Sequence, residues 1–251
     1  MKTQLKALTI GLIAGLGGGL FSLGGGTLTV PLLLRWLGLS VFEARGTALA
    51  AAFLPAVAGM VLYAQAGKVD WLAVVMVSVP AMMVTPLTGM WTERLSGTHL
   101  RRVFGAVVVT GAVFLLLRDQ LLGSWAIPEI GRPWYMIGVG IIEGLVAGSV
   151  GISGGPVLAP LLVLGLGMPQ QLAQGCSLAA RIPVVISGSV ENMCHRHVCL
   201  RLLPALFAGG LVGIWLGSRT ALALSELHLR SLFAIILLVL GIRYLREKIR
   251  T

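Results

Sequence analysis

The chain has 251 residues, of which 57% are hydrophobic and 11% are charged. That balance leaves too little polar surface to cover a water-soluble globule of this length, so it excludes a soluble protein and indicates a membrane protein that lies in a lipid bilayer. The formal net charge of +10 is spread over short connections and not gathered on one face or tail, which argues against nucleic acid as a partner.

The first half contains five apolar runs, at residues 8–23, 27–37, 44–65, 71–91 and 100–117. A helical crossing needs about 20 apolar residues, and the last three runs are long enough to cross. The second run is too short, because its eleven residues rise only about 16 Å in a hydrocarbon layer about 30 Å thick. We therefore expect a broken, re-entrant-like helical hairpin that returns to its starting side, followed by three transmembrane helices.

Three consecutive glycines interrupt this hairpin in "SLGGGT" (22–27), and Pro31 follows. Backbone groups near mid-bilayer must face protein or a watery cavity, because each unsatisfied group costs several kcal/mol in lipid. The helix that begins here presents free N–H donors and the positive end of its dipole, and glycine lets a ligand approach the backbone closely. The pattern favours a small-anion site at Gly24, Gly25 and Gly26. The hydroxyls of Ser22 and Thr27 are expected to be further donors to the anion.

The second half repeats this pattern 129 positions later, where the interruption reads "GISGGP" (151–156) and contains Ser153, Gly154 and Gly155. We expect an all-α polytopic membrane protein made of a first transmembrane repeat at 1–120, an outer linker at 121–133 and a second transmembrane repeat at 134–251. A hairpin plus three spans makes an odd number of crossings, so the second repeat is expected to be inverted. Glycine ladders in the first run of each half favour close helix packing over a cavity: Gly11, Gly15, Gly19 and Gly140, Gly144, Gly148.

Charge supports this inverted topology. With the N-terminus inside, thirteen Lys and Arg residues fall in inner segments and five in outer segments, which is the excess expected of cytoplasmic loops. Both termini are therefore predicted to be cytoplasmic. The inner residues are Lys2, Lys6, Arg35, Arg45, Arg94, Arg101, Arg102, Arg196, Arg201, Arg243, Arg246, Lys248 and Arg250, and the outer ones are Lys68, Arg118, Arg132, Arg219 and Arg230.

Two charged residues stand out within predicted spans, where charge is expensive and often functional. Arg181 has Ala52 as its repeat counterpart, so a single fixed positive charge breaks the symmetry where it can select an anion. The alternatives are an ion pair with Glu143 and a side chain that reaches the interface. Glu143 either pairs with Arg181 or carries a coupling proton, if burial raises its pKa.

No motif for ATP hydrolysis, zinc-dependent proteolysis or a serine hydrolase is present in the sequence, so an enzyme and a cofactor are not expected. The segment "CHRHVC" (194–199) superficially resembles a metal site. Its ligands are too close together to suit one tetrahedral ion, so we interpret it as a basic interfacial loop and expect no metal. Cys176 either lines the cavity or packs as a small residue.

The motifs "GLIAGLGGGLFSLGGGTLTVPLLL" and "GLVAGSVGISGGPVLAPLL" resemble the TauE/SafE sulfite exporter family, related to the sulfonate uptake permeases, over nearly the whole chain. The resemblance implies a carrier of the bacterial inner membrane for sulfite, sulfoacetate or other sulfonates. It assigns the pocket to the glycines and small polar residues of both halves: Gly24, Gly25, Gly26, Thr27, Thr47, Ser153, Gly154, Gly155 and Ser177. Arg181 departs from the family pattern, in which an apolar or small polar residue is common, and family members differ in transport direction.

The sequence therefore predicts a secondary transporter that holds a small sulfur-containing anion at glycine-rich half-helix N-termini and works by alternating access. A passive anion channel, a carrier of another oxyanion or carboxylate, and a non-transporting membrane subunit remain as alternatives. The driving force is expected to be a proton gradient or the gradient of the anion itself. A homodimer is left open as the assembly.

Overall fold

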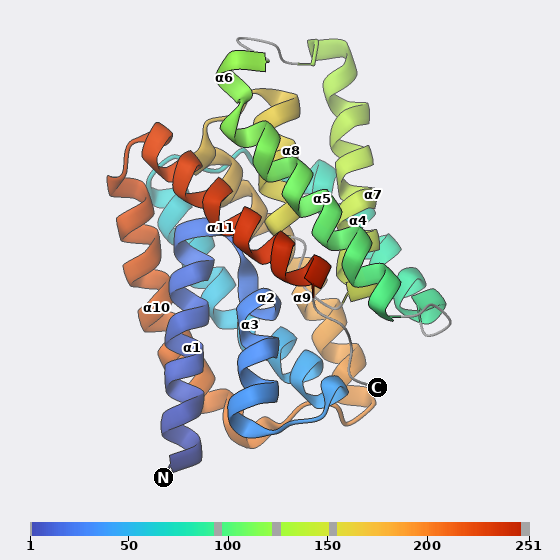
Figure 1. Ribbon diagram of the computed structural model, residues 1–251, viewed down its shortest axis with the longest axis vertical. Helices are drawn as coiled ribbons and strands as arrows, with labels where there is room; N and C mark the ends of the chain where they lie inside the picture. The colour runs from blue at the N-terminus through green and yellow to red at the C-terminus, as the bar shows by residue number, and fades with distance from the viewer. Residues whose placement is uncertain (1, 93–96, 122–126, 151–154, 247–251) are drawn as a thin grey trace.

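The computed structural model describes residues 2–92, 97–121, 127–150 and 155–246, and every regular element in these ranges is helical (Figure 1). The longer helices connect through short turns, and one π-helical turn and two 3₁₀ turns complete the set. In chain order the elements are α1 (Lys2–Phe21), α2 (Gly24–Leu32), η1 (Leu33–Leu37), α3 (Val41–Gln65), α4 (Trp71–Thr92), α5 (Gly97–Leu116), α6 (Arg118–Leu121), η2 (Glu129–Gly131), α7 (Arg132–Val150), α8 (Gly155–Leu166), α9 (Gln170–Cys194), η3 (Leu200–Leu202), α10 (Leu203–Ala223) and α11 (Glu226–Arg246).

Five helices in the described part of the chain are long and apolar enough to cross a membrane: Lys2–Phe21, Val41–Gln65, Trp71–Thr88, Leu200–Ala223 and Glu226–Arg246. Large apolar side chains remain exposed at helical spacing, as in Val75, Val79, Met83 and Leu87 of α4, which are 49–64% exposed. Such a stripe is costly in water and suits contact with lipid. The predicted all-α polytopic membrane protein is confirmed.

Each half begins with a hairpin that returns to its own end. Lys6 Nζ donates to Trp36 O at 3.1 Å, which ties the start of α1 to the end of η1. Ile127 N donates to Gly165 O at 2.9 Å and ties the entry of α7 to the end of α8. The two hairpins approach from opposite ends of the molecule and meet near its middle (Figure 1). The hairpin predicted from the short second run is confirmed.

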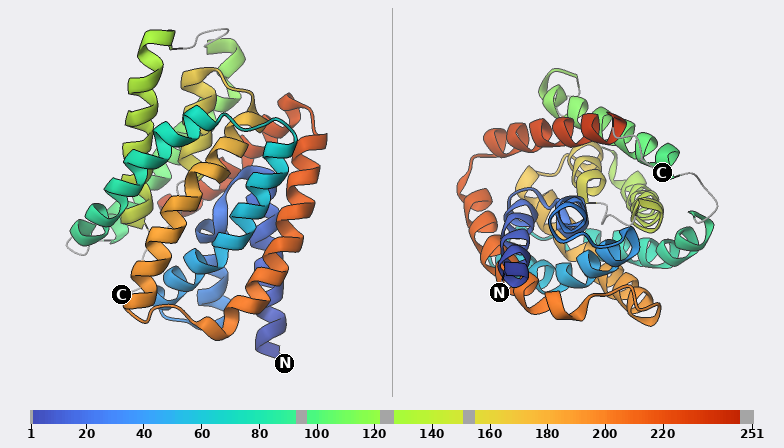
Figure 2. Two further views of the ribbon diagram at one scale, coloured as in Figure 1. Left: turned by 180° about the vertical axis from the view of Figure 1, so that it is seen from behind. Right: turned by 60° about the horizontal axis from the view of Figure 1, so that its bottom comes forward.

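The first hairpin turns at Ser22 and Leu23, directly before the three predicted glycines, which lie in the first turn of α2. Ser22 ends α1 in the left-handed conformation, with φ of 52°, and its N–H donates to Gly18 O at 2.8 Å. Only Leu23 separates it from Gly24, the first residue of α2. A non-glycine residue rarely adopts positive φ, so Ser22 holds a strained turn at a buried point of the fold. The turned-back helices α2 and α8 lie inside the ring of longer helices in the right-hand view of Figure 2.

The glycine ladders pack helices from different halves together. A methyl group on Gly11 or Gly15 would collide with the carbonyls of Leu206 or Gly210 in α10. The equivalent Gly140 would collide with the carbonyl of Val77, and a methyl group on Gly144 would lie 2.7 Å from Ala81 O, both in α4. The close packing predicted for these ladders is confirmed, and it pairs α1 with α10 and α7 with α4.

Two loops also dock across the halves, at positions that are again 129 residues apart. Cys199 N donates to Thr47 Oγ1 at 2.9 Å, so the loop after α9 is held by α3. Asp70 N donates to Cys176 Sγ at 3.2 Å, so the loop after α3 is held by α9. Thr47 and Cys176 therefore both accept a backbone N–H from a loop of the other half. Cys176 is buried and acts as a structural acceptor.

Candidate functional site

The turn of the first hairpin touches the start of α8. A methyl group built on Gly155 would collide with the carbonyl oxygen of Ser22 and with Nη2 of Arg181. Only glycine fits this approach without displacing one of the two groups. The interrupted ends of both hairpins and the single arginine of α9 therefore meet at one buried point.

Arg181 is the largest fully buried side chain of the described residues, with 1% of its surface exposed. Its Nη2 donates to the carbonyl oxygen of Ser22 and lies 3.2 Å from Ser22 Oγ. Its Nε has no hydrogen-bond partner among the described residues. A buried guanidinium with an unused donor is expensive unless another acceptor reaches it. The side chain is thus suited to bind an anion.

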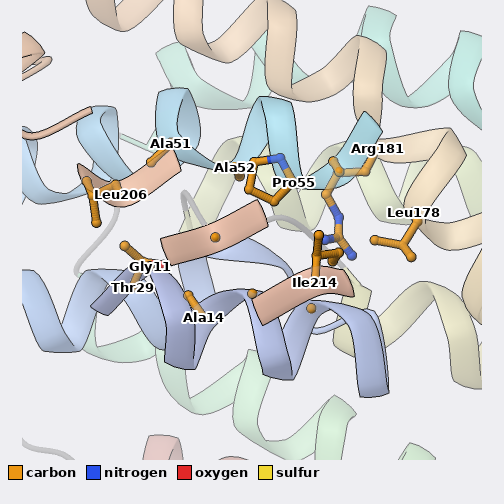
Figure 3. A pocket seen from close by; sticks show the side chains of 14 residues that line it. Gly11, Ala14, Thr29, Ala51, Ala52, Pro55, Leu178, Arg181, Leu206 and Ile214 are labelled. Carbon is orange, nitrogen blue, oxygen red and sulfur yellow. The ribbon is translucent and has the colours of Figure 1, made fainter. Parts of the chain in front are cut away.

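A cavity of about 30 Å³ lies beside this guanidinium, which is room for about two water molecules. Figure 3 shows Arg181 extending into it from α9, next to Leu178, Pro55 and Ile214. Among the described residues that line the cavity, Arg181 is the only charged one, and the others are small or apolar apart from Thr29: Gly11, Ala14, Gly15, Gly18, Thr29, Ala51, Ala52, Pro55, Ala56, Leu178, Leu206, Gly210 and Ile214. In such walls one positive charge dominates the field that a ligand meets.

Glu143 is the second buried charge near this site, with 2% of its surface exposed on α7. The Arg181 guanidinium donates to Ser22 through Nη2, and Arg181 also lies against Gly155 at the start of α8. Arg181 therefore bridges the two hairpins.

The other sequence-predicted site residues are divided by the structure. Gly24, Gly25, Gly26 and Thr27 form the first turn of α2, whose N-cap residue Leu23 makes no side-chain capping bond. The Thr27 hydroxyl is buried without a partner among the described residues. The side chain of the N-cap residue therefore does not use the N–H groups of this turn. Gly24 to Thr27 are not among the residues that line the cavity beside Arg181.

Ser177 and Thr47 lie elsewhere. Ser177 is fully buried one helical turn before Arg181, and its Oγ has no partner in the described part of the chain. The Thr47 hydroxyl is bonded to the loop at Cys199 and does not line the cavity. Ser153 and Gly154 lie outside the described residues.

Sequence reasoning omitted two buried glutamines of α9. Gln170 and Gln174 are 0% exposed, and with Ser177 and Arg181 they follow one another at intervals of four, three and four residues. That spacing places them on one face of a helix. The sequence shows this spacing, but neutral amides in a span are a weaker signal of a site than charged residues are.

Comparisons with known proteins agree with this architecture. A family model described as sulfite exporter TauE/SafE matches residues 1–115 and 106–244. A probable membrane transporter protein of Methanocaldococcus jannaschii is 23% identical, over 94% of this chain and 92% of its own. Proteins of the same description from Xylella fastidiosa and Bacillus subtilis are 27% and 26% identical. The match to the Xylella fastidiosa protein covers 96% of this chain and 95% of that protein. The match to the Bacillus subtilis protein covers 82% of this chain and 85% of that protein.

Proposed function

The chain belongs to the sulfite exporter TauE/SafE family and is a membrane transporter, and we propose that it carries a small sulfur-containing anion across the bacterial inner membrane. The resemblance noted from the paired glycine motifs is thereby confirmed at the level of the family. Sulfite, sulfoacetate and other organosulfonates are the proposed substrates. The family's description supports this class, and the chemistry of the site supports an anion.

One observation carries the proposal: Arg181, the largest fully buried side chain of the described residues, contacts the turn of the first hairpin and lies against the start of α8, beside a cavity. An oxyanion that enters the cavity offers acceptors to Arg181, whose Nε is unused by the described residues. Helix α2 contributes Thr29 to the lining of this cavity, and its first turn, Gly24 to Thr27, lies outside the lining and is proposed to reach the anion when the hairpins move. A fixed guanidinium and a helix N-terminus are both strong sites for oxyanions. The anion then competes with Ser22 for Arg181.

We propose that transport is alternating access between two inverted repeats, at 1–120 and 134–251, with residues 121–133 as an outer linker. The repeat-related contacts of the glycine ladders and of the docked loops support this division. Because Arg181 contacts both hairpins, binding at this point can bias one arrangement of the hairpins over another. Glu143 is proposed either to balance the guanidinium charge or to carry a coupling proton.

The charge distribution supports cytoplasmic N- and C-termini. With both termini inside, the segments on the inner side carry the excess of Lys and Arg, as cytoplasmic loops do. Transport is driven by a proton gradient or by the gradient of the anion itself. A passive channel is the competing class. Saturable counterflow by purified protein in liposomes distinguishes the two, because a channel does not couple influx of one anion to efflux of another.

The test is a counterflow screen of sulfite, thiosulfate, sulfate, sulfonates and short carboxylates with purified protein in liposomes. We expect a sulfur anion to be exchanged best, and we expect Arg181→Ala to weaken its binding by at least about 100-fold, the scale of charge-assisted hydrogen bonds. Arg219→Ala is the matched control, because Arg219 is exposed over the ring of Trp215. Unchanged affinity in folded Arg181→Ala protein contradicts the site, and exclusive exchange of carboxylates contradicts the substrate class.

A further inference from the structure

A line of buried polar atoms leads along α9 from its first residue to Arg181. Gln170, Gln174 and Ser177 are each 0% exposed. At about 100° per residue, these three and Arg181 fall within an arc of about 60° on the helix. Both amide atoms of Gln170, Nε2 of Gln174 and Oγ of Ser177 have no hydrogen-bond partner among the described residues. We call Gln170, Gln174 and Ser177 the polar stripe.

A structural role does not account for this stripe. An unpartnered buried polar group costs about 1–3 kcal/mol, so apolar residues in its place would favour folding. The adjacent Gln171 shows how α9 uses an amide for structure, since its Nε2 lies 3.0–3.3 Å from three carbonyls at the end of α10, those of Ala221, Leu222 and Leu224. Gln170 and Ser177 make no such bond to the described residues, and Gln174 makes one through its Oε1 only, to the Tyr63 hydroxyl.

The equivalent positions of the first half carry no neutral amide or hydroxyl donors. The repeat counterparts of Gln170, Gln174 and Ser177 are Val41, Arg45 and Ala48 in α3. Ala48 lies in an apolar cluster with Ile10 and Leu33. The line of neutral donors is therefore peculiar to α9, the same helix that carries the arginine.

We propose that the polar stripe is the outer access route of the anion and passes a small oxyanion to Arg181 through neutral N–H and O–H donors. This inference rests on the proposed transport function. Neutral donors attract an anion without holding it as a fixed charge does, which suits a path that must release its ligand. The stripe begins at the end of α9 nearest Lys68, whose carbonyl contacts Gly175.

The route is closed in this structure, and one side chain links its closure to the first hairpin. The Tyr63 hydroxyl lies 2.8 Å from Gly19 O and 2.9 Å from Gln174 Oε1. Gly19 is in the last turn of α1, next to the hairpin turn. Movement of that hairpin would therefore change the surroundings of Gln174, and this couples opening of the stripe to the alternating-access step.

The first experiment compares Gln170→Leu with Gln171→Leu in liposomes loaded for counterflow of radiolabelled sulfite. Gln170→Leu should keep or raise the thermal unfolding midpoint, because it removes an unpartnered amide. It should raise the KM for sulfite added from the Lys68 side roughly tenfold, the loss expected for one hydrogen bond to a charged ligand. Gln171→Leu should lower the unfolding midpoint and leave KM unchanged. A Gln170→Leu protein with wild-type KM, or with lowered stability, overturns the proposal.

The second experiment needs no transport. In a protein whose three native cysteines are replaced, Ser177→Cys is treated with a membrane-impermeant anionic thiol reagent from either side. Lys68→Cys defines the outer side, and Ala51→Cys, on the cavity, reports the other route. We expect Ser177→Cys to be labelled from the Lys68 side. Labelling only from the opposite side, or none while Ala51→Cys reacts, overturns the proposal. If the wild type exchanges no anion, the proposed function fails, and this labelling still tests the route.

Discussion

Helices α3 and α9 have 25 residues each and occupy equivalent places in the two halves, yet their inward faces differ. They cross each other in a symmetric way: a methyl group on Gly59 would lie 3.2 Å from Leu178 Cδ1, and one on Gly188 would lie 3.4 Å from Leu49 Cδ1. Gly59 and Gly188 are 129 positions apart, as are Leu49 and Leu178. The crossing is therefore symmetric in backbone and asymmetric in chemistry.

The difference at this crossing is one of charge. Ala52 and Arg181 are 129 positions apart, and both line the same cavity. Arginines at both positions would bring like charges together in a buried place. Alanine on α3 keeps that side of the cavity uncharged.

The largest expected effect comes from making the crossing symmetric. Ala52→Arg adds a second buried guanidinium, and an uncompensated buried charge costs about 3–5 kcal/mol. We expect the thermal unfolding midpoint in detergent to fall sharply. Moving the charge, with Ala52→Arg and Arg181→Ala together, should recover most of that stability. A single Ala52→Arg variant as stable as the wild type would show that the two positions do not share one space.

A smaller loss of stability is expected from a substitution in either glycine ladder, and the loss should be equal in the two ladders. Gly11→Ala and Gly140→Ala each force a methyl group against a backbone carbonyl of the neighbouring helix, and such overpacking costs about 1–3 kcal/mol. Gly138→Ala is the control, because nothing lies within 4 Å of a methyl group there. Thermal unfolding of the three variants measures the comparison. A large difference between Gly11→Ala and Gly140→Ala would mean that the halves are held together unequally.

The smallest loss of stability is expected when the hydrogen bonds that hold the two docked loops are removed. Thr47→Val removes the acceptor of the Cys199 N–H and should cost about 1 kcal/mol. Cys176→Ala should cost less, because sulfur is a weak acceptor. Neither variant should change the binding of sulfite, measured by counterflow. A tenfold loss of affinity in Thr47→Val would return Thr47 to the anion pocket, where the family resemblance had assigned it.

Much of the fold could be predicted from the sequence because hydropathy and helix breakers act locally. The run at 27–37 is too short to cross, and the structure ends α1 at Phe21 and restarts the chain at Gly24. The run predicted at 71–91 is helix Trp71–Thr92. Lipid requires long apolar helices, so the lengths of the apolar runs predict these elements with little dependence on distant contacts.

The site was less predictable because its contacts join distant segments. The charge of Arg181 could be noticed from its missing counterpart at Ala52, but its acceptor is the carbonyl of Ser22, which has no sequence signature. The oxygen of the Thr47 hydroxyl accepts from the Cys199 N–H, and Thr47 does not line the cavity beside Arg181, neither of which has a sequence signature. Polar residues within a helix show their partners only when the loops that cover them are placed.

The single arginine also bears on the ancestry of the chain. Two separate copies of one half-length chain would form a two-fold dimer, and any residue near its axis would then occur twice. Such a dimer could not carry an arginine opposite an alanine, because both positions would be encoded by the same codon. A gene that joins the halves frees each position to change alone. An arginine and an alanine at equivalent places on one cavity are therefore a combination that two identical half-length chains could not provide.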